Sequence, residues 1–342
     1  IIMNIAIGYH LHSGPWGGGN QFAKSLVTAL EIKGHTVNFD LRQIDLDLIL
    51  LTETRGRSPS GSFDAGDILR YLNFKNPNAI VVHRINECDE RKGTSSMNQL
   101  LKRANYTADH TVFIASWLKD LDLWEKARSH SVILNGGNAK IFKKKENITI
   151  NRGGRVRLVT HHWGNDERKG ADVYQFINDL LDSPEYRDQF EFTYIGNVPI
   201  SCNLSNSTIK APMHGEELAN ELRSHDIYVT GSINEPAGMH HIEAALCGLP
   251  IIYRKSGALP EYCDGFGLGF EQVNELQSVI NQIRLNYGVF FEALERYPYT
   301  ADRMCDEYLE LFNELISQRA NIIKKRRLWR SPWKVLRNQI AI

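Results

Sequence analysis

The sequence has no net charge and no long apolar segment. Its 342 residues carry 40 Lys and Arg against 40 Asp and Glu. Without an overall electrostatic field the chain has no general attraction for polyanions, so we expect no nucleic-acid partner. No stretch is long and apolar enough to span a bilayer. The hydrophobic fraction of 42% is typical of a globular protein with a buried core.

Cysteine is scarce, and the five residues are scattered without a CxxC pair. They are Cys88, Cys202, Cys247, Cys263 and Cys305. An odd number without paired spacing favours reduced thiols over disulfides or a zinc site, which predicts a cytoplasmic protein. The first residues, IIMNIAIGY, are typical of a buried strand and lack the basic leader and cleavage site of a signal peptide.

A dinucleotide fingerprint is also absent. Gly17, Gly18 and Gly19 follow the first predicted strand in the run GPWGGGNQ, and their spacing is not that of GxGxxG. Glycines at the carboxyl end of a strand allow positive φ and close backbone approach to a diphosphate or a sugar. A flexible turn is the alternative interpretation.

Short β-like runs alternate with amphipathic helical stretches along the chain. The strands predicted first are 3–9, 36–39, 46–51, 79–83, 111–114 and 131–134, and a helix is expected over 21–33. After residue 155 the alternation restarts, with strands in RVRLVTHHW, FEFTYIG, DIYVTGS and LPIIY. Such alternation predicts an α/β protein with mostly parallel sheets covered on both faces.

The alternation is interrupted once, which predicts two domains. The interruption, 143–155, is charged, rich in turn residues and poor in large apolar residues, so we expect a linker there. The domains would be 1–142 and 156–317. Ligands of open α/β sheets bind at the carboxyl ends of the strands, so two such domains facing each other would hold a site in the cleft between them.

The segment Asn234–Pro250, NEPAGMHHIEAALCGLP, contains two carboxylates at a predicted helix start. Glu235 lies in a Gly/Pro loop, and Glu243 lies one turn inside the helix that opens near Gly238. Carboxylates accept hydroxyl hydrogen bonds, and the amides at a helix N-terminus favour a phosphate. A nucleotide sugar has both groups. An acidic first turn on an ordinary packed helix is the alternative.

Several segments together resemble family 4 retaining glycosyltransferases of the GT-B fold, over nearly the whole chain. The segment 234–250 is similar to the donor-sugar motif of that family, with two glutamates eight positions apart. SGALPEY resembles its Gly-rich loop before a Pro-Glu pair, and WGGGNQFAKSLVTALEIKGHTV resembles its first loop and helix. SWLKDL and VILNGGNAKIF resemble the segments that close its first domain. The resemblance implies two Rossmann-like β/α/β domains facing across a cleft.

The resemblance also implies roles for individual residues. Glu235 would bind donor-sugar hydroxyls, with Gly238 and Met239 presenting backbone amides, and Glu243 would bind the ribose hydroxyls. Lys169, in THHWGNDERKGADVY, resembles the family lysine that contacts the donor diphosphate. A cation at a helix N-terminus is unfavourable to the helix dipole, and an anionic ligand would relieve it. A solvated lysine is the alternative.

The sequence departs from the family at one position. The family has an arginine about five residues before the lysine, and this position is Gly164. Arg168, next to Lys169, would substitute for it, or His162 would reach the phosphate from the end of the strand. The residues leave this choice open.

His83 is the candidate on the acceptor side. It is predicted to end the strand AIVVH, where the family often has a histidine that faces the reacting sugar. A neutral imidazole could hydrogen-bond a sugar hydroxyl or orient the acceptor, whereas a structural histidine is the alternative. Asn86, Glu87, Asp89 and Glu90 follow in a predicted acceptor loop, and the sequence does not select a base among them.

No metal site is expected. The triplet DLD at 45–47 resembles the metal-binding motif of the other glycosyltransferase fold, but it begins an alternating strand where outward polar residues are normal. The pairs at 161–162 and 240–241 are adjacent histidines, whose side chains diverge. We therefore expect no cofactor beyond a nucleotide diphosphate sugar as co-substrate, with Lys169 supplying positive charge at its phosphates.

The C-terminal tail, KKRRLWRSPWKV, is basic and aromatic. Such a segment can lie on an anionic membrane surface, which suggests peripheral contact through 324–337 at the inner membrane surface. The family resemblance instead implies a C-terminal helix, about 318–342, that packs back on the first domain. Both interpretations are compatible.

The function expected from these features is transfer of a sugar from a nucleotide diphosphate sugar to an acceptor hydroxyl. Retention at the anomeric carbon by same-face attack follows from the resemblance, and the acceptor would be a glycan, a lipid-linked molecule or a small molecule. The alternatives are a nucleotide-sugar epimerase of the same fold and a sugar-nucleotide-binding protein without catalysis. No residue pattern in the sequence identifies the nucleotide base, the sugar or the acceptor.

Overall fold

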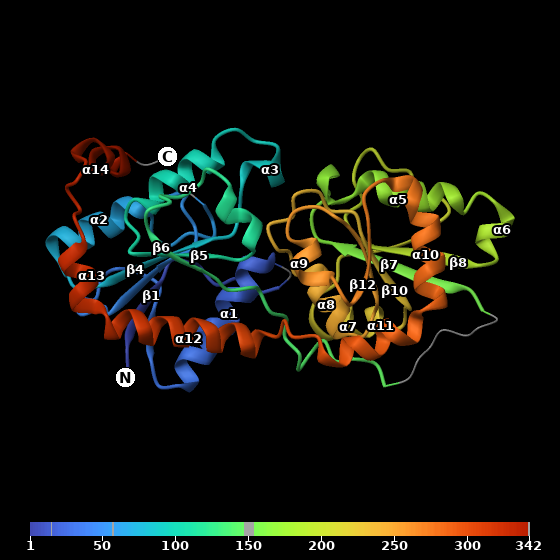
Figure 1. The fold of residues 1–342 in the computed structure, drawn as a ribbon, viewed down its shortest axis with the longest axis horizontal. Helices are drawn as coiled ribbons and strands as arrows, with labels where there is room; N and C mark the ends of the chain where they lie inside the picture. The colour runs from blue at the N-terminus through green and yellow to red at the C-terminus, as the bar shows by residue number, and fades with distance from the viewer. Residues whose placement is uncertain (15, 57, 147–153, 341–342) are drawn as a thin grey trace. The chain divides into compact units, whose positions relative to one another are not determined.

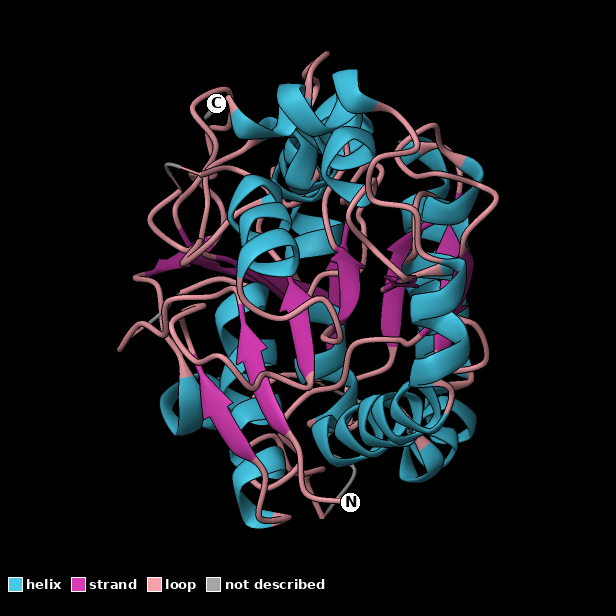
Figure 2. Ribbon diagram, turned by 90° about the vertical axis from the view of Figure 1, so that its left-hand side faces the viewer, coloured by secondary structure: helices cyan, strands magenta, loops and turns pink. Residues whose placement is uncertain are grey.

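The computed structural model describes residues 1–14, 16–56, 58–146 and 154–340, which form two compact units (Figure 1). Unit 1 comprises residues 1–13, 18–134 and 302–342, and unit 2 comprises residues 14–17 and 135–301. Of the predicted linker 143–155, residues 147–153 lie outside the described residues. Each unit contains its own parallel sheet, and Figure 2 shows strands with helices on both sides.

Unit 1 has a six-stranded parallel sheet in the order β2-β1-β3-β4-β5-β6. Its strands are β1 (Asn4–Ile7), β2 (Thr36–Asn38), β3 (Leu48–Leu51), β4 (Ile80–Ile85), β5 (His110–Phe113) and β6 (Ser129–Val132). Its helices are α1 (Gly18–Ile32), α2 (Ala65–Phe74), α3 (Asp89–Lys92), α4 (Met97–Asn105), the 3-10 turn η1 (Ser116–Asp120), α12 (Ala301–Ser317), α13 (Arg319–Lys325) and α14 (Pro332–Gln339). This order reverses direction between β1 and β3.

Alternate residues of the first sheet bury two different faces. Ile5, Leu50 and Val82 pack with α1 and α12 in one core, whereas Ile49 and Val81 pack with α2 in another. A strand buried on both faces must be apolar at every position, which explains the continuous run LILL in β3. The first sheet is therefore doubly covered, as the sequence predicts.

Unit 2 has a second six-stranded parallel sheet, in the order β12-β11-β10-β7-β8-β9. Its strands are β7 (Val156–His162), β8 (Phe190–Gly196), β9 (Thr208–Lys210), β10 (Ile227–Thr230), β11 (Ile251–Arg254) and β12 (Gly267–Phe270). Its helices are α5 (Ala171–Leu180), α6 (Pro184–Arg187), α7 (Gly215–Arg223), α8 (His240–Leu246), α9 (Leu259–Cys263), α10 (Leu276–Leu285) and α11 (Tyr287–Ala293), with 3-10 turns η2 (Glu167–Lys169), η3 (Val273–Glu275) and η4 (Leu294–Arg296).

The order of the second sheet is that of a dinucleotide-type Rossmann domain. Numbered along unit 2, it reads 6-5-4-1-2-3, and the direction of winding reverses between β7 and β10. One face of the sheet packs on α5 and α10 through a single apolar core, which includes Leu158, Ile177 and Ile280. The reversal places the carboxyl ends of β7 and β10 side by side.

Three predicted boundaries differ from the structure. The first helix begins at Gly18 rather than Gln21, and β4 continues past His83 to Ile85. The tail is not one helix over 318–342, because α13 ends at Lys325 and α14 begins at Pro332. Proline at the first turn of α14 has a fixed φ that suits a helix start, so it opens a new helix here.

No helix among the described ranges of the chain combines the length and the apolar content that are needed to cross a membrane.

Candidate donor site

Polar side chains follow both strands at the reversal point of the second sheet. β7 ends in His161 and His162, and β10 ends at Thr230 before a loop that leads to α8. In open α/β sheets the crevice outside the carboxyl ends at such a point is the usual ligand position. The predicted residues Lys169, Glu235 and Glu243 all follow one of these two strands.

Lys169 and Glu235 form an ion pair. The Lys169 Nζ atom lies 2.7 Å from Glu235 Oε2, and the two side chains are 17% and 5% exposed. A charge-assisted bond of this length in a largely buried place fixes both side chains. The structure thus brings together two residues that lie 66 positions apart in the sequence.

Two glycines explain how these residues meet. Gly170 has a φ of +109°, and a Cβ atom there would lie 2.6 Å from the Cα atom of Gly231. Only glycine adopts this φ without strain and lets the backbones after β7 and β10 approach so closely. The Lys169 carbonyl oxygen also accepts a 2.9 Å hydrogen bond from the Tyr174 hydroxyl, which anchors the turn to α5.

The loop at 256–258 packs against the Glu235 loop. Asn234 has a φ of +50°, and its backbone N–H donates to the Ser256 hydroxyl over 2.9 Å. The Ala258 N–H donates to the Glu235 carbonyl oxygen over 2.9 Å. A Cβ atom on Gly257 would lie 2.5 Å from the backbone N and O atoms of Glu235. The two motifs that are similar to the family therefore pack on each other.

Glu243 forms a second buried pair, with His161. His161 Nε2 lies 2.9 Å from Glu243 Oε2, and the side chains are 10% and 4% exposed. Among the described residues, the other carboxylate oxygen of Glu243 and the other ring nitrogen of His161 have no hydrogen-bond partner. One carboxylate oxygen is thus held by the strand end, while the other remains able to accept.

Gly238 and Met239 form the entry to α8. Gly238 has a φ of +66°, and a Cβ atom there would lie 3.2 Å from the Glu235 carboxyl carbon. The Met239 carbonyl oxygen accepts the first helical bond, from the Glu243 N–H over 2.9 Å. Every side chain of this seven-residue helix is buried, including that of Glu243. The backbone at Gly238 and Met239 is therefore tied to both glutamates.

His162 and Arg168 lie in different surroundings. His162 is buried, and its Nε2 atom lies 2.5 Å from the Tyr174 hydroxyl and 3.2 Å from the Thr160 hydroxyl. Arg168 is half-buried, its backbone is hydrogen-bonded to Asp166 and Ile233, and its guanidinium forms no ion pair within the ranges that the structure describes. Arg168 thus keeps an uncommitted cation beside Lys169, whereas the His162 ring is held within the core.

The glycine candidates follow β1 in the sequence, with Gly18 and Gly19 in unit 1 and Gly17 in unit 2. Gly17 precedes α1, and Gly18 and Gly19 form its first turn. None of the three has positive φ, which differs from the reason predicted for them. A Cβ atom on Gly19 would touch the Tyr9 ring at 3.4 Å, while one on Gly17 would meet nothing within 4 Å. Neither positive φ nor lack of space therefore requires glycine at Gly17 or at Gly19.

His83 lies inside the first sheet rather than at a strand end. Its side chain has no exposed surface, and Nδ1 lies 3.1 Å from the Asn105 side-chain nitrogen. Within the described parts of the chain its Nε2 atom has no partner. Burial lowers the pKa of His83 to about 3, so the ring is neutral at physiological pH. Any contact with an acceptor would require an opening that this conformation lacks.

The described residues contain no group of three His, Cys, Asp or Glu side chains that could hold a metal ion. Asp45 and Asp47, which belong to the DLD triplet, form structural contacts instead. Asp47 accepts a hydrogen bond from the Asn4 N–H and forms an ion pair with Arg319, and Asp45 accepts a hydrogen bond from the Asn4 side chain.

The contact of His161 with Glu243 is not among the predictions from the sequence, which gave the adjacent histidines as a poor metal site and His162 as a candidate phosphate contact. The signal was the length of β7: its buried side chains at 156, 158 and 160 pack towards α5, so by alternation 161 faces the side of α8. Gly231 and Tyr174, which align the Lys169 turn, carried no recognisable motif.

One part of the chain is similar to a known protein family. Residues 201–283, which include the Glu235 loop, α8 and the loop at 256–258, match the family model described as "Glycosyl transferases group 1". No curated protein matches the chain. The matched segment lies within unit 2.

Solved structures show the same fold at low identity. Sucrose-phosphate synthase from Thermosynechococcus elongatus is 14% identical, with a TM-score of 0.66 over 92% of this chain and 99% of that one. HepE from Anabaena, in complex with UDP, is 15% identical, with a TM-score of 0.68 over 92% of this chain and all of that one. WaaG, a glycosyltransferase involved in lipopolysaccharide biosynthesis, is 15% identical, with a TM-score of 0.55 over 94% of this chain and 100% of that one. The fold is therefore GT-B, with two Rossmann-like domains.

Proposed function

We propose that the protein transfers a sugar from a nucleotide diphosphate sugar to an acceptor hydroxyl, with retention at the anomeric carbon and without a metal ion. The observation that carries this proposal is the pair of buried contacts at the reversal point of the second sheet, Lys169 with Glu235 and His161 with Glu243. HepE, one of the similar structures, holds UDP-glucose in its crystal structure, which supports a donor of this class.

The Lys169 ammonium would bind the donor diphosphate. It lies beside Glu235 in the structure, so a phosphate that approaches would share the ammonium with the carboxylate. The unpaired Arg168 guanidinium would add the second cation that the family places at Gly164, where a side chain would meet nothing within 4 Å. These two cations would neutralise charge that accumulates on the leaving diphosphate, which makes a metal ion unnecessary.

The two glutamates would bind hydroxyls rather than act as nucleophiles. Glu235, beside the backbone of Gly238 and Met239, would accept hydrogen bonds from the donor sugar. Glu243 would accept from the ribose with the oxygen that has no partner among the described residues. A buried carboxylate oxygen without a partner is costly, so a ribose hydroxyl would stabilise it.

The reaction would proceed on one face of the sugar. The acceptor oxygen forms a bond to the anomeric carbon as the bond to the diphosphate oxygen breaks. The acceptor proton passes to the departing diphosphate, which removes the need for a protein base. Domain closure would exclude water and limit hydrolysis of the donor. The acceptor, a glycan, a lipid-linked molecule or a small molecule, would bind to unit 1.

The test begins with a panel of UDP-, GDP- and ADP-sugars scored by thermal shift, because a ligand of the native state raises its apparent stability. A donor that stabilises the protein is then incubated with hydroxyl acceptors in the presence of a chelator, and the product anomer is determined by NMR. Inversion would refute same-face attack, and loss of activity with the chelator would refute metal independence.

Two other results would replace the proposal. Conversion of the donor sugar without any acceptor would identify an epimerase. Binding without turnover on every acceptor would identify a sugar-nucleotide-binding protein.

Glu243→Gln should weaken donor binding by about ten- to a hundredfold, because a neutral amide loses the charge-assisted bond. Glu221→Gln is the matched control: Glu221 also accepts from a cation, Lys210 Nζ at 2.7 Å, but on α7. Equal donor affinity in the two variants would contradict the assignment of Glu243.

A further inference from the structure

The segment 318–342 contains eight cations and no Asp or Glu. The cations are Arg319, Lys324, Lys325, Arg326, Arg327, Arg330, Lys334 and Arg337. The rest of the chain has the opposite balance, with 32 Lys and Arg against 40 Asp and Glu, because the protein as a whole is neutral. A one-signed segment of this kind needs either internal carboxylates or an external anionic partner.

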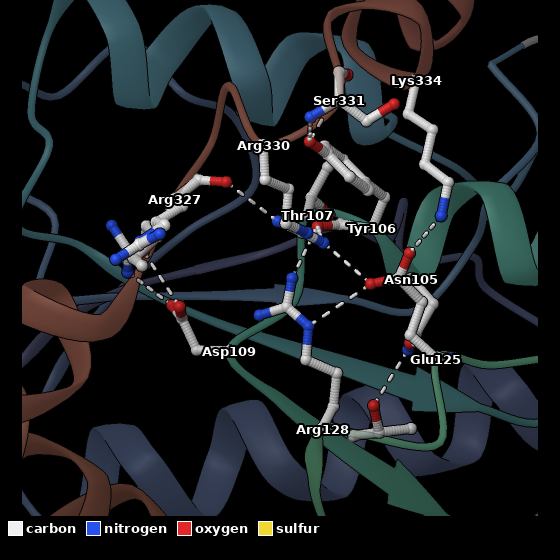
Figure 3. A network of polar contacts seen from close by, with 12 residues as sticks. Asn105, Tyr106, Thr107, Asp109, Glu125, Arg128, Arg327, Arg330, Ser331 and Lys334 are labelled. Atoms are coloured by element: carbon white, nitrogen blue, oxygen red, sulfur yellow. Dashed lines mark hydrogen bonds and ion pairs between the residues drawn. The ribbon is translucent and has the colours of Figure 1, made fainter.

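Half of these cations are bound within unit 1. Arg319 pairs with Asp47, Arg326 with Asp109, and both Arg330 and Lys334 with Glu125, at 2.8 and 2.7 Å. Figure 3 shows Arg330 and Lys334 converging on Glu125.

Tyr106 completes this anchor. The Arg330 guanidinium lies 3.7 Å from the centre of the Tyr106 ring, and the Tyr106 hydroxyl bonds the backbone on both sides of the turn before α14, at Leu328 and Ser331. These bonds fix the direction in which α14 leaves the turn.

The other half of the cations points to solvent. Lys324, Lys325, Arg327 and Arg337 are exposed, and within the described residues none of their side chains has an ion-pair partner. The segment is therefore divided into cations that attach it to unit 1 and cations that remain available.

The face that α14 turns outward is apolar. Val335 and Asn338 are buried against unit 1, where the Asn338 side chain donates to the Arg103 carbonyl oxygen over 3.2 Å. At 100° per residue, the opposite face of α14 carries Trp333 and Leu336, which are 81% and 53% exposed, and Ile340, which directly follows the helix, is 67% exposed. A helix on the surface of a soluble domain normally has the reverse arrangement.

We propose that the outer face of α14, together with Trp329 and the four unpaired cations, docks on an anionic lipid surface. Trp333 and Leu336 of α14, with Ile340 directly after the helix, would enter the boundary between headgroups and acyl chains, and the flanking Lys and Arg would bind the headgroup phosphates. Trp329 is 57% exposed and hydrogen-bonded to Asn73, next to Phe74, which is 84% exposed. These rings extend the apolar surface onto α2.

A lipid surface explains both the unpaired cations and the exposed apolar face of the segment, whereas each other kind of partner explains only one of them. Nucleic acid would use the cations but offers no apolar layer for Leu336 and Ile340. A second copy of the chain in a two-fold contact would cover the apolar face, but its own segment would bring cations of the same sign. The inference does not rest on the donor site, because all of its residues belong to unit 1.

The test is co-sedimentation of the full protein with vesicles. Binding to vesicles of phosphatidylcholine mixed with an equal amount of phosphatidylglycerol is expected, with little binding to phosphatidylcholine alone and a decline as salt rises. The double variant Trp333→Ser/Leu336→Ser should lose binding by about tenfold or more. Trp333→Phe should retain binding but reduce fluorescence quenching by brominated lipid, because the ring that enters the bilayer is no longer a tryptophan.

A matched control is Leu285→Ser/Val289→Ser. These residues are also highly exposed, at 80% and 67%, but lie in unit 2 on α10 and α11, and their replacement should leave vesicle binding unchanged. Circular dichroism and melting temperature should not distinguish the two double variants. Equal vesicle binding by wild type and Trp333→Ser/Leu336→Ser would overturn the proposal.

Three further outcomes also overturn it. Absence of binding to both kinds of vesicle would show that the face has another use. A wild-type dimer in solution that the double variant abolishes would assign the face to a second copy. Retention on single-stranded RNA without vesicle binding would assign the segment to nucleic acid.

Discussion

The two sheets reverse their winding at equivalent places, yet these places contain different chemistry. In unit 2 the reversal point holds two polar pairs, in which His161 at the end of β7 binds Glu243 and Lys169 after β7 binds Glu235. In unit 1 it holds Gly18 and Gly19 in the first turn of α1, and the other candidate of this unit, His83, is closed inside the sheet. Unit 2 therefore has charged side chains already in place at its reversal point, whereas unit 1 has glycine backbone there.

The largest effect is expected from breaking the buried ion pair of unit 2. Lys169→Met leaves the Glu235 carboxylate buried without its cation, which should lower the free energy of unfolding by about 3 kcal/mol. Turnover should fall by about 100- to 1000-fold, because the positive charge at the diphosphate is lost. Denaturant unfolding and steady-state kinetics measure the two effects.

Lys210→Met is the control for this experiment. The Lys210 and Glu221 side chains are also 2.7 Å apart but are 36% and 17% exposed. Its loss should lower stability by less than about 1 kcal/mol, since exposed pairs contribute little. Similar costs for the two substitutions would mean that the Lys169 pair behaves as a surface pair.

The second largest effect tests the close approach of the two loops. Gly257 and Gly265 have φ values of +58° and +84°, so alanine is strained at both. At Gly257 the new Cβ atom also collides with the Glu235 backbone, whereas at Gly265 it would meet nothing within 4 Å. Gly265→Ala should lower the free energy of unfolding by about 1 kcal/mol, and Gly257→Ala should cost more and also weaken donor binding. Thermal melts and donor titrations would separate the backbone strain of alanine at positive φ from the collision of its Cβ atom with the Glu235 backbone. Equal stability and equal donor affinity in the two variants would argue against the collision.

A smaller effect is expected at His161, which positions Glu243. His161→Gln keeps a donor nitrogen near the place of Nε2, whereas the shorter His161→Asn does not reach it. We expect the donor KM to rise by about tenfold or more in His161→Asn and to recover largely in His161→Gln, with kcat affected less. A uniform loss of kcat in both variants would instead point to a general packing defect.

The smallest effect at neutral pH is expected at His241. Burial lowers its pKa to about 3 from the ordinary 6.5, and within the described residues neither ring nitrogen has a partner. Between these values the unfolded chain binds a proton that the folded chain does not, so stability is lost as pH falls from 6.5 towards 3. The loss from this one group is about 1.4 kcal/mol per pH unit.

His241→Phe should therefore reduce the dependence of the free energy of unfolding on pH by one proton between pH 6 and pH 4, roughly the window in which the group differs between states. Above pH 7 the slope should be unchanged. Urea titrations across this range measure it, and an unaltered slope in the acid range would show that the ring is accessible to protons in the native state.

The sequence predicts what depends on local pattern. The alternation of apolar runs predicts two doubly covered parallel sheets, because strands buried on both faces must be apolar throughout. Two strands escaped prediction. β9 is a three-residue edge strand with mostly exposed side chains, and β12 contains two glycines, of which Gly267 touches the backbone of Ile251. Neither has the hydrophobic signal on which the prediction relies.

The site shows a similar limit. Lys169, Glu235 and Glu243 belong to recognisable motifs, so they can be selected from the sequence. Their pairing cannot, since it depends on the close contact of Gly170 with Gly231, which brings together segments far apart in the sequence. The burial of His83 escaped for the same reason: it follows from the continuation of β4 by two residues, and boundaries are the least certain part of a pattern.

The helix α12 has a consequence for how the protein is made. Its residues Met304, Tyr308 and Phe312 complete the core that β1, β3 and β4 share with α1. Unit 1 therefore begins first at the ribosome but keeps this apolar surface open until α12 emerges, after the whole of unit 2 has been synthesised. Limited proteolysis of chains arrested before Asp302 should find unit 2 protected and unit 1 cleaved. The half of the molecule translated first would thus be the half that folds last.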